Sequence, residues 1–166
     1  MAISAAMVKE LRERTSLGMM ECKKALAEAG GDMDQAIEDL RKKSSLKAAK
    51  KAGRTTANGL LGVKSSEDGT RIALVEVNIE TGFAAKNEKF IAFVSKVAQT
   101  LFDSGDMDSV TQTLNAEREA LVQEIGENLA IRRGALVQSA SGGLSYYMHG
   151  DQRRGAIVQL ADKHDE

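Results

Sequence analysis

The spacing of apolar residues changes once along this chain, and the change restricts the folds open to it. In residues 1–44 apolar residues recur at helical intervals, as Cys22, Ala25 and Leu26 do in one segment. After residue 59, short apolar runs alternate with turn sequences and with two longer helical patterns. The sequence therefore predicts an α+β protein, with an amino-terminal three-helix module followed by an antiparallel sheet that carries helices packed on one side.

The amino-terminal module, residues 1–44, has its clearest signals in its third helix. Asp32 and Gln35 form a predicted capping box after the Gly30-Gly31 stop. The apolar residues that follow share one helical face: Met33, Ala36, Ile37 and Leu40. A module of about forty residues lies near the lower size limit for a separate domain. We expect it to resemble the compact ubiquitin-associated bundle and to act through one exposed face.

A basic segment follows the third helix. Seven lysines or arginines and no acidic residue lie between residues 41 and 54. Ala48 and Ala52 favour helix here, and Gly53 favours its end. We interpret residues 45–58 as a solvated connector between modules. The alternative is an RNA-binding segment, although no aromatic residue is interleaved among the cations to stack on bases.

Residues 59–166 show a strand and helix rhythm and are predicted to form one α+β core subdomain. A hairpin is expected around the tight-turn pair Asp68-Gly69, which separates two apolar runs. The apolar spacing then predicts two helices, one ending near Gly105 and one ending at Gly126. Three further strands are expected at residues 129–139, 144–149 and 155–161.

Composition excludes several classes of protein. Of 166 residues, 42% are apolar, but no apolar run reaches the roughly 18 residues of a membrane-spanning helix. The balance of 23 basic and 24 acidic residues argues against nonspecific binding of nucleic acid. The single Cys22 cannot form an internal disulfide, which agrees with a reducing compartment. We therefore expect a cytoplasmic protein with no membrane contact and no direct nucleic-acid partner.

The sequence lacks the residue patterns of common enzymes and cofactor sites. It contains neither the G-x-x-x-x-G-K-[ST] loop nor a G-x-G-x-x-G pattern after a strand. Two histidines, His149 and His164, and one cysteine cannot supply a typical structural zinc set. Cys22 lies on an apolar helical stripe, so we interpret it as a small buried thiol and not as a nucleophile. No cofactor, no metal site and no enzymatic activity are expected.

Four segments, in this order, resemble the bacterial elongation factor Ts family. They are residues 8–26, the alanine-lysine run at 48–52, residues 76–86, and residues 125–129 followed by Arg132-Arg133. The resemblance covers nearly the whole chain, from Met7 to about Ala161. It implies a guanine-nucleotide exchange factor that binds elongation factor Tu, both GDP-bound and nucleotide-free, and promotes release of GDP during translation elongation.

The resemblance also implies a site between a strand and a helix. Thr81, Gly82, Phe83 and Ala84 stand where the family usually has Thr-Asp-Phe-Val. In the family this Phe enters the GTPase beside its magnesium and phosphate site, displaces the metal and releases GDP. Gly82 departs from the pattern because it removes a carboxylate and adds backbone freedom, so we expect weaker exchange than in typical members. Burial of Phe83 in the helix core is the alternative.

Four further residues are predicted to dock the GTPase: Arg12, Met19, Met20 and His149. Flexible methionine side chains suit a surface that must fit a partner. Each residue also has a simpler interpretation. Met20 can cover the three-helix core, Arg12 can be a solvated helix charge, and His149 can be an ordinary surface residue at a strand end.

The rival functions are a binding-only adaptor for elongation factor Tu, which Gly82 keeps open, and a basic RNA-associated protein. Family members usually continue beyond the point where this chain stops, at Glu166. A fragment, a compact natural variant and a viral version all fit that difference, and each predicts lower affinity than a longer relative. Exposed backbone at the last strand also leaves a homo-oligomer open.

Overall fold

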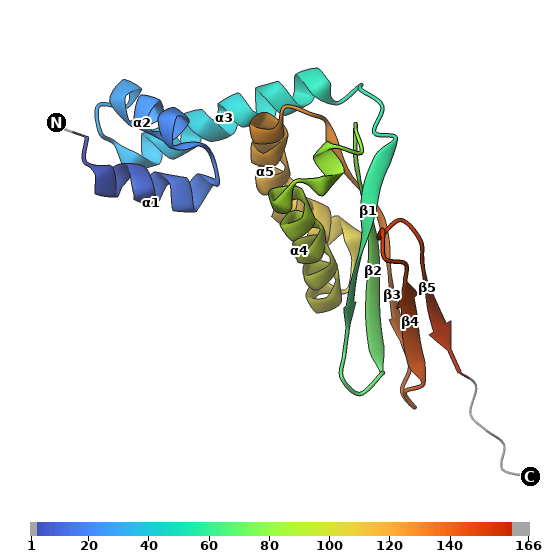
Figure 1. Ribbon diagram of the computed structural model, residues 1–166. Coiled ribbons are helices and arrows are strands. Elements are labelled where there is room, and N and C mark those ends of the chain that lie inside the picture. Colours follow the sequence, from blue (N-terminus) through green and yellow to red (C-terminus); the bar gives the residue numbers. More distant parts are fainter. Residues whose placement is uncertain (1–2, 161–166) are drawn as a thin grey trace, which may run out of the picture. The chain divides into compact units, whose positions relative to one another are not determined.

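The computed structural model describes residues 3–160, which divide into two compact units (Figure 1). The first contains the residues up to Thr55 together with Leu114–Leu129. The second contains Thr56–Thr113 and the residues from Ala130 onward. The first unit is helical and the second combines strands with helices, so the predicted α+β class, with three helices before the sheet, is confirmed.

Three amino-terminal helices form the first unit with the second half of a later helix. They are α1 (Ala5–Thr15), α2 (Met19–Glu28) and α3 (Met33–Lys51), and the later helix is α5 (Met107–Ile125). The apolar stripes predicted from helical spacing meet in one core. Its buried members are Val8, Leu11, Leu17, Cys22, Ala25, Leu26, Ala36, Leu40 and, from α5, Ala120.

The cap of α3 differs in part from the predicted capping box. Asp32 Oδ1 accepts a hydrogen bond from Gln35 N at 3.0 Å, as expected. The second bond of a capping box, from the Gln35 side chain back to the backbone of Asp32, is not formed. This part of the prediction is wrong, because Gln35 Nε2 donates to Asp39 Oδ1 at 2.9 Å. Residues four apart are neighbours on a helix surface, so Asp39 offers the amide a partner further along the helix.

The basic segment after residue 44 continues α3 without a break as far as Lys51. Ser44 and Ala48 are buried, and Ser44 Oγ donates to Gln123 Oε1 of α5 at 2.9 Å. Lys51 Nζ donates to Gly126 O at 2.7 Å, where α5 has ended. The predicted helical tendency of this segment is confirmed, and one side of it packs against α5.

The second unit contains five strands within the described residues. They are β1 (Asn58–Ser65), β2 (Arg71–Ile79), β3 (Leu129–Gln138), β4 (Leu144–Met148) and β5 (Gly155–Gln159). They form two sheets, with the order β1-β2-β3 in one and the antiparallel pair β4-β5 in the other. The predicted hairpin is confirmed, with Leu60 opposite Val77 in its register.

One face of the three-stranded sheet is covered by α4 (Glu88–Ser104), as Figure 1 shows. The helical face predicted from spacing is buried, and Phe90 and Val97 are fully enclosed. Asn87 caps the helix by accepting from Lys89 N at 2.9 Å. The helix ends at Gly105, whose φ of 86° is left-handed and therefore suits glycine.

Gly62 in β1 allows α4 to approach the sheet closely. A Cβ at this position would lie 2.8 Å from Val94 O and 2.9 Å from Val94 Cγ1. We expect Gly62→Ala to lower the free energy of unfolding by about 1–3 kcal/mol, because the helix must move away. Urea unfolding measures this change. Gly150→Ala, where nothing lies within 4 Å of the added Cβ, should differ little from the parent, and equal loss in both variants would contradict the packing argument.

Candidate partner-binding surfaces

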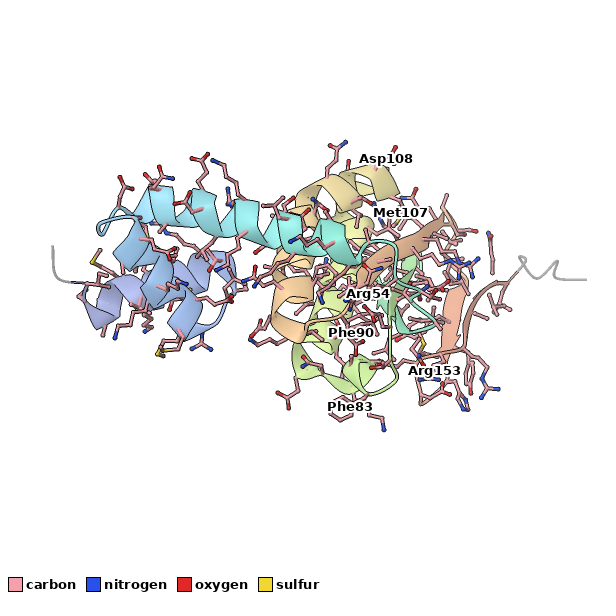
Figure 2. All side chains as sticks on the ribbon, turned by 90° about the horizontal axis from the view of Figure 1, so that it is seen from above. Arg54, Phe83, Phe90, Met107, Asp108 and Arg153 are labelled. Atoms are coloured by element: carbon pink, nitrogen blue, oxygen red, sulfur yellow. The ribbon has the colours of Figure 1, made fainter. Side chains whose placement is uncertain are left out.

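Phe83 projects from the turn between β2 and α4. Its side chain is 89% exposed, while Phe90, seven residues later, is fully buried. Figure 2 shows the Phe83 ring at the periphery of the second unit. Burial of Phe83 in the helix core, the alternative from the sequence, is therefore wrong. An exposed phenylalanine ring is available for contact with another molecule.

Hydrogen bonds on both sides of Phe83 hold the turn in one conformation. Thr81 Oγ1 accepts from Ala84 N at 3.1 Å, and Thr81 O accepts from Ala85 N at 3.1 Å. Phe83 O accepts from Lys86 N at 3.1 Å in the short helix η1 (Ala84–Lys86). Since Ala84 is only 5% exposed, its methyl group packs inward and anchors the turn. A turn fixed in this way loses little backbone entropy on binding.

Gly82 lies beside two polar side chains that the sequence did not single out. A Cβ at Gly82 would lie 3.3 Å from Arg153 Nη2 and 3.3 Å from Asn58 Oδ1. Asn58 is oriented by its own bond, because its Nδ2 donates to Glu80 O at 3.0 Å. Arg153 Nη2 in turn donates to Asn58 Oδ1 at 3.5 Å. Glycine therefore allows these two polar side chains to lie close to the backbone next to Phe83.

Met19 and Met20 are both exposed at the start of α2, at 60% and 75%. The interpretation of Met20 as a cover for the core is therefore wrong. The preceding Leu17 is only 1% exposed and fixes the turn to the core below. Arg12, on α1, is also exposed. The first unit thus displays two methionines and a cation, each supported by buried neighbours.

Cys22 faces the core of the first unit, as predicted. Its side chain is fully enclosed, and burial raises the pKa of the thiol. Thr15 Oγ1 lies 3.7 Å from Cys22 Sγ. A thiol in these surroundings is protonated and inert at neutral pH.

His149 follows β4, which ends at Met148, one residue earlier than predicted. The residue is half-buried. Its backbone N donates to Arg154 O at 2.8 Å, and its Nδ1 lies 2.9 Å from the Tyr147 hydroxyl. The loop that carries His149 also carries Arg153, so the structure brings this loop to the Phe83 turn, where Arg153 lies beside Gly82.

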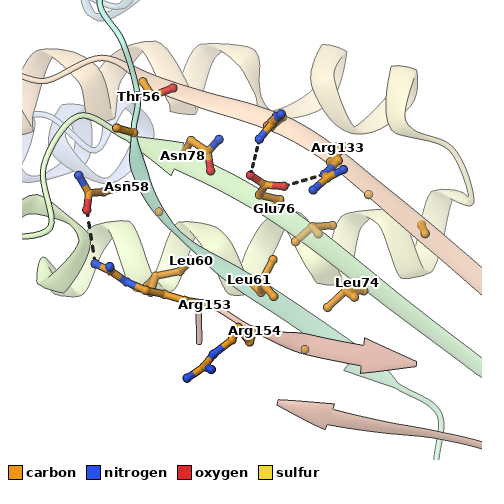
Figure 3. A pocket seen from close by; sticks show the side chains of 17 residues that line it. Thr56, Asn58, Leu60, Leu61, Leu74, Glu76, Asn78, Arg133, Arg153 and Arg154 are labelled. Atoms are coloured by element: carbon orange, nitrogen blue, oxygen red, sulfur yellow. Dashed lines mark hydrogen bonds and ion pairs between the residues drawn. The ribbon is translucent and has the colours of Figure 1, made fainter. Parts of the chain in front are cut away.

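A groove of about 840 Å³ crosses the second unit (Figure 3). Strands β1, β2 and β3 and the start of β5 line it. Its charged lining residues are Glu76 and four arginines: Arg132, Arg133, Arg153 and Arg154. From the sequence, Arg132 and Arg133 were recognised only as part of a family motif, and Arg153 and Arg154 were not predicted to have a role. The sequence shows that Arg153 and Arg154 lie next to a turn, but not that both arginine pairs line one groove.

Glu76 joins two of these arginines. Its Oε1 lies 3.0 Å from Arg132 Nη1, and its Oε2 lies 2.6 Å from Arg133 Nε. Burial pushes the pKa of Glu76 upward, but hydrogen bonds from Arg133, Asn78 and Arg132 outweigh it and hold the pKa below its usual value. The carboxylate is therefore charged at neutral pH and neutralises part of the arginine cluster.

The lowered pKa of Glu76 predicts a pH-dependent stability. A carboxyl group with a lower pKa in the folded state stabilises the fold above its unfolded pKa, and this contribution is lost as pH falls through the folded value. We expect Glu76→Gln to lower the free energy of unfolding by about 1 kcal/mol at pH 7, since the ion pairs are partly exposed. The difference should shrink as pH falls below 4.5.

Urea unfolding at stepped pH tests this expectation. Glu67→Gln, in the exposed turn between β1 and β2, is the matched control and should show little change at either pH. A Glu76→Gln deficit of constant size from pH 7 to about pH 3 would show that packing, and not ionisation, causes the loss.

Within residues 3–160, no group of three histidine, cysteine or acidic side chains is placed to hold a metal ion. None of the helices in this part of the chain is long and apolar enough to cross a membrane.

Comparisons with known proteins give a consistent result. The family model described as Elongation factor TS matches residues 80–166. The chain is 52% identical to Elongation factor Ts of Teredinibacter turnerae over 165 residues, covering 98% of this chain and 56% of the relative. It is 53% identical to Elongation factor Ts of Hahella chejuensis over 162 residues, covering 96% and 56%. The Arthrospira platensis Elongation factor Ts is 49% identical, with 96% and 67% covered. The chain thus spans little more than half the length of the first two relatives.

Proposed function

Since this chain belongs to the elongation factor Ts family, we propose that it binds elongation factor Tu and promotes release of GDP from it. In this proposal Phe83 enters the GTPase near its magnesium and phosphate site, and the Met19-Met20 surface anchors the complex. The exchange factor makes and breaks no covalent bond, so it is not an enzyme in the chemical sense. Its proposed place of action is the cytoplasm.

The exposure of Phe83 on a fixed turn is the observation that carries the proposal. A ring that fits the nucleotide-free GTPase better than the GDP-bound form weakens GDP binding by the factor by which GDP weakens the complex. Burial of one phenylalanine contributes about 1.5–3 kcal/mol. That free energy corresponds to roughly a ten- to hundredfold change in nucleotide affinity.

The docking residues supply affinity that does not depend on the nucleotide. Met19 and Met20 offer adaptable apolar contact, and Arg12 offers hydrogen-bond donors on the same helical unit. His149 lies in the loop whose Arg153 is next to the Phe83 turn, so we place it at the edge of the same contact. Thr81 and Ala84 take part by positioning the turn.

A binding-only adaptor is the second candidate function. Gly82 offers no side chain to the metal site, and the Ala84 methyl group is buried. Of the four residues at 81–84, Phe83 thus carries the large exposed side chain. If that single ring does not disturb the nucleotide site, the chain binds the GTPase without exchange.

Release of fluorescent GDP from purified elongation factor Tu tests these candidates. Faster release in the presence of the chain supports exchange. Complex formation in gel filtration with no change in release supports the adaptor. Absence of both complex and acceleration would contradict the proposed function.

The basic segment gives less support to an RNA-associated protein. Lys42 pairs with Glu38 at 2.6 Å, and Lys47 pairs with Glu21 at 3.4 Å. Lys51 donates to the carbonyl of Gly126. These cations serve the helix and its packing, so salt-sensitive retention of RNA by the chain would be needed to revive that function.

A further inference from the structure

We propose that the arginine groove, defined by Arg132, Arg133, Arg153 and Arg154, binds an acidic segment of another polypeptide, and that this segment belongs to the protein that receives Phe83. The second half of this proposal, the identity of the partner, rests on the proposed function. The first half, that the groove binds an acidic segment, is argued from the lining residues of the groove alone.

The charge of the groove is unbalanced. Four arginines line it against one glutamate, and Glu76 is already held by Arg132 and Arg133 at 3.0 and 2.6 Å. The carboxylate of Glu76 is thus used on one side of the groove. The second pair, Arg153 and Arg154, has no such carboxylate partner among the described residues that line the groove.

Arg153 is placed to bind a carboxylate. Among residues 3–160 its Nη2 makes one long bond, 3.5 Å, to Asn58 Oδ1, and Figure 3 shows its side chain directed toward Asn58 along the groove. Because Gly82 has no side chain, this guanidinium can lie against the turn: a Cβ there would be only 3.3 Å from Arg153 Nη2. A planar guanidinium with several N–H donors binds a carboxylate through two parallel hydrogen bonds.

Asp151 shows that a carboxylate is stabilised near this pair. A hydrogen bond from the backbone N of Arg153 lowers the pKa of Asp151, and the charges of Arg154 and Arg153 lower it further. Asp151 lies in the loop itself and is not a lining residue of the groove. Asp151 offsets part of the charge of the two arginines, and one acidic residue against two arginines leaves a net positive charge.

The uncharged lining favours a peptide over a phosphate ligand. Leu61 and Leu74 and small residues such as Ala135 form apolar surface between the arginines. Such surface suits the alkyl part of acidic side chains and the backbone of an extended peptide. Arginine binds phosphate as well as carboxylate, but a free phosphate would leave this apolar surface uncovered.

The same lining disfavours RNA. Single-stranded nucleic acid is held by aromatic side chains on which bases stack, together with cations. Among the described residues that line the groove, none is aromatic. The amides of Asn58 and Asn78 can instead bond the backbone of a peptide.

The position of Arg153 connects the groove to the Phe83 turn. A Cβ on Gly82 would lie 3.3 Å from Arg153 Nη2. The end of the groove that Arg153 lines is therefore adjacent to the Phe83 turn. A protein that covers the Phe83 ring would also cover this end. Acidic residues on that protein would then pair with Arg153 and Arg154.

Hexaglutamate is titrated into the full chain, and NMR of the chain measures binding. Hexaglutamate should shift the side-chain amide signals of Asn58 and Asn78, and hexaglutamine should not. Arg153→Gln/Arg154→Gln should weaken hexaglutamate binding about tenfold, since two charge-assisted pairs are lost. Lys64→Gln/Lys96→Gln removes the same charge outside the groove and should change binding less than about twofold.

Two results would overturn the first half of the proposal. One is equal hexaglutamate affinity in the parent chain and in Arg153→Gln/Arg154→Gln. The other is a shift of the Asn58 and Asn78 signals by pyrophosphate or oligouridine but not by hexaglutamate. Either result would assign the groove to other chemistry.

Competition decides the second half separately. Nucleotide-free elongation factor Tu should displace hexaglutamate from the chain. A complex that forms while hexaglutamate stays bound would show that the groove serves another acidic protein and would overturn this half. If no complex forms at all, the proposed function fails, and the hexaglutamate titration still decides the chemistry of the groove.

Discussion

Phe83→Ala should reduce the acceleration of GDP release by roughly ten- to hundredfold at saturating concentrations of the chain. The ring is 89% exposed, so its removal takes nothing from the core and should change the free energy of unfolding by less than about 0.5 kcal/mol. Complex formation should persist, because the Met19-Met20 surface is intact. Stopped-flow release of fluorescent GDP measures the maximal rate.

Leu160→Ala is the matched control for this experiment. Leu160 is an apolar side chain with 66% exposure in the same unit, and it follows β5, away from the turn in sequence. Its removal should leave the maximal rate unchanged. If elongation factor Tu released GDP as fast with Phe83→Ala as with the parent chain, Phe83 would be a contact residue at most. The binding-only adaptor would then be the better description of the function.

The helices and strands follow from the sequence because their periodicity is local. Phe90, Val97 and Leu101 recur at helical spacing, and all of them face the sheet in α4. The Asp68-Gly69 turn also places β1 against β2 in the expected hairpin. These features depend on residues a few positions apart, which sequence patterns describe well.

Contacts between distant segments were not available from these patterns. Ser44 bonds Gln123, 79 positions away, and this pairing shows which later helix covers the buried side of α3. The division of the strands into two sheets is another long-range feature, since β4 pairs with β5 and not with β3. Periodicity shows which face of an element is apolar but not which element covers it.

The candidate site shows the same limit. Sequence position left Phe83 equally suited to the core and to the surface, and only the exposed fraction of its side chain decides. Arg153 was missed because its importance comes from Gly82, 71 positions earlier, which lies beside it in space. The resemblance to a family identified the turn, but it did not predict which residues lie beside the turn in space.

Met19→Ala/Met20→Ala should weaken the complex with elongation factor Tu by about ten- to a hundredfold. Both side chains are at least 60% exposed, so the substitutions remove contact area without opening the core. The binding constant should depend little on salt, because the lost contact is apolar. Isothermal titration calorimetry with nucleotide-free GTPase measures the change.

Leu46→Ala is the control that distinguishes a specific methionine contact from nonspecific apolar binding. Leu46 lies on α3 in the same unit and is 65% exposed, close to the methionines in exposure but outside the predicted docking set. The Leu46→Ala variant should bind elongation factor Tu with the same affinity as the parent chain. Equal weakening by Leu46→Ala would mean that the methionines hold no special position in the complex.

The methionine and phenylalanine variants should differ in which kinetic quantity they change. If the methionines contribute equally to the GDP-bound and nucleotide-free complexes, their loss raises the concentration needed for half-maximal release and leaves the maximal rate intact. Phe83→Ala should lower the maximal rate, because the ring distinguishes the two nucleotide states. A fall in the maximal rate with Met19→Ala/Met20→Ala would show that docking and release are coupled through one contact, which contradicts the division of roles between the two units.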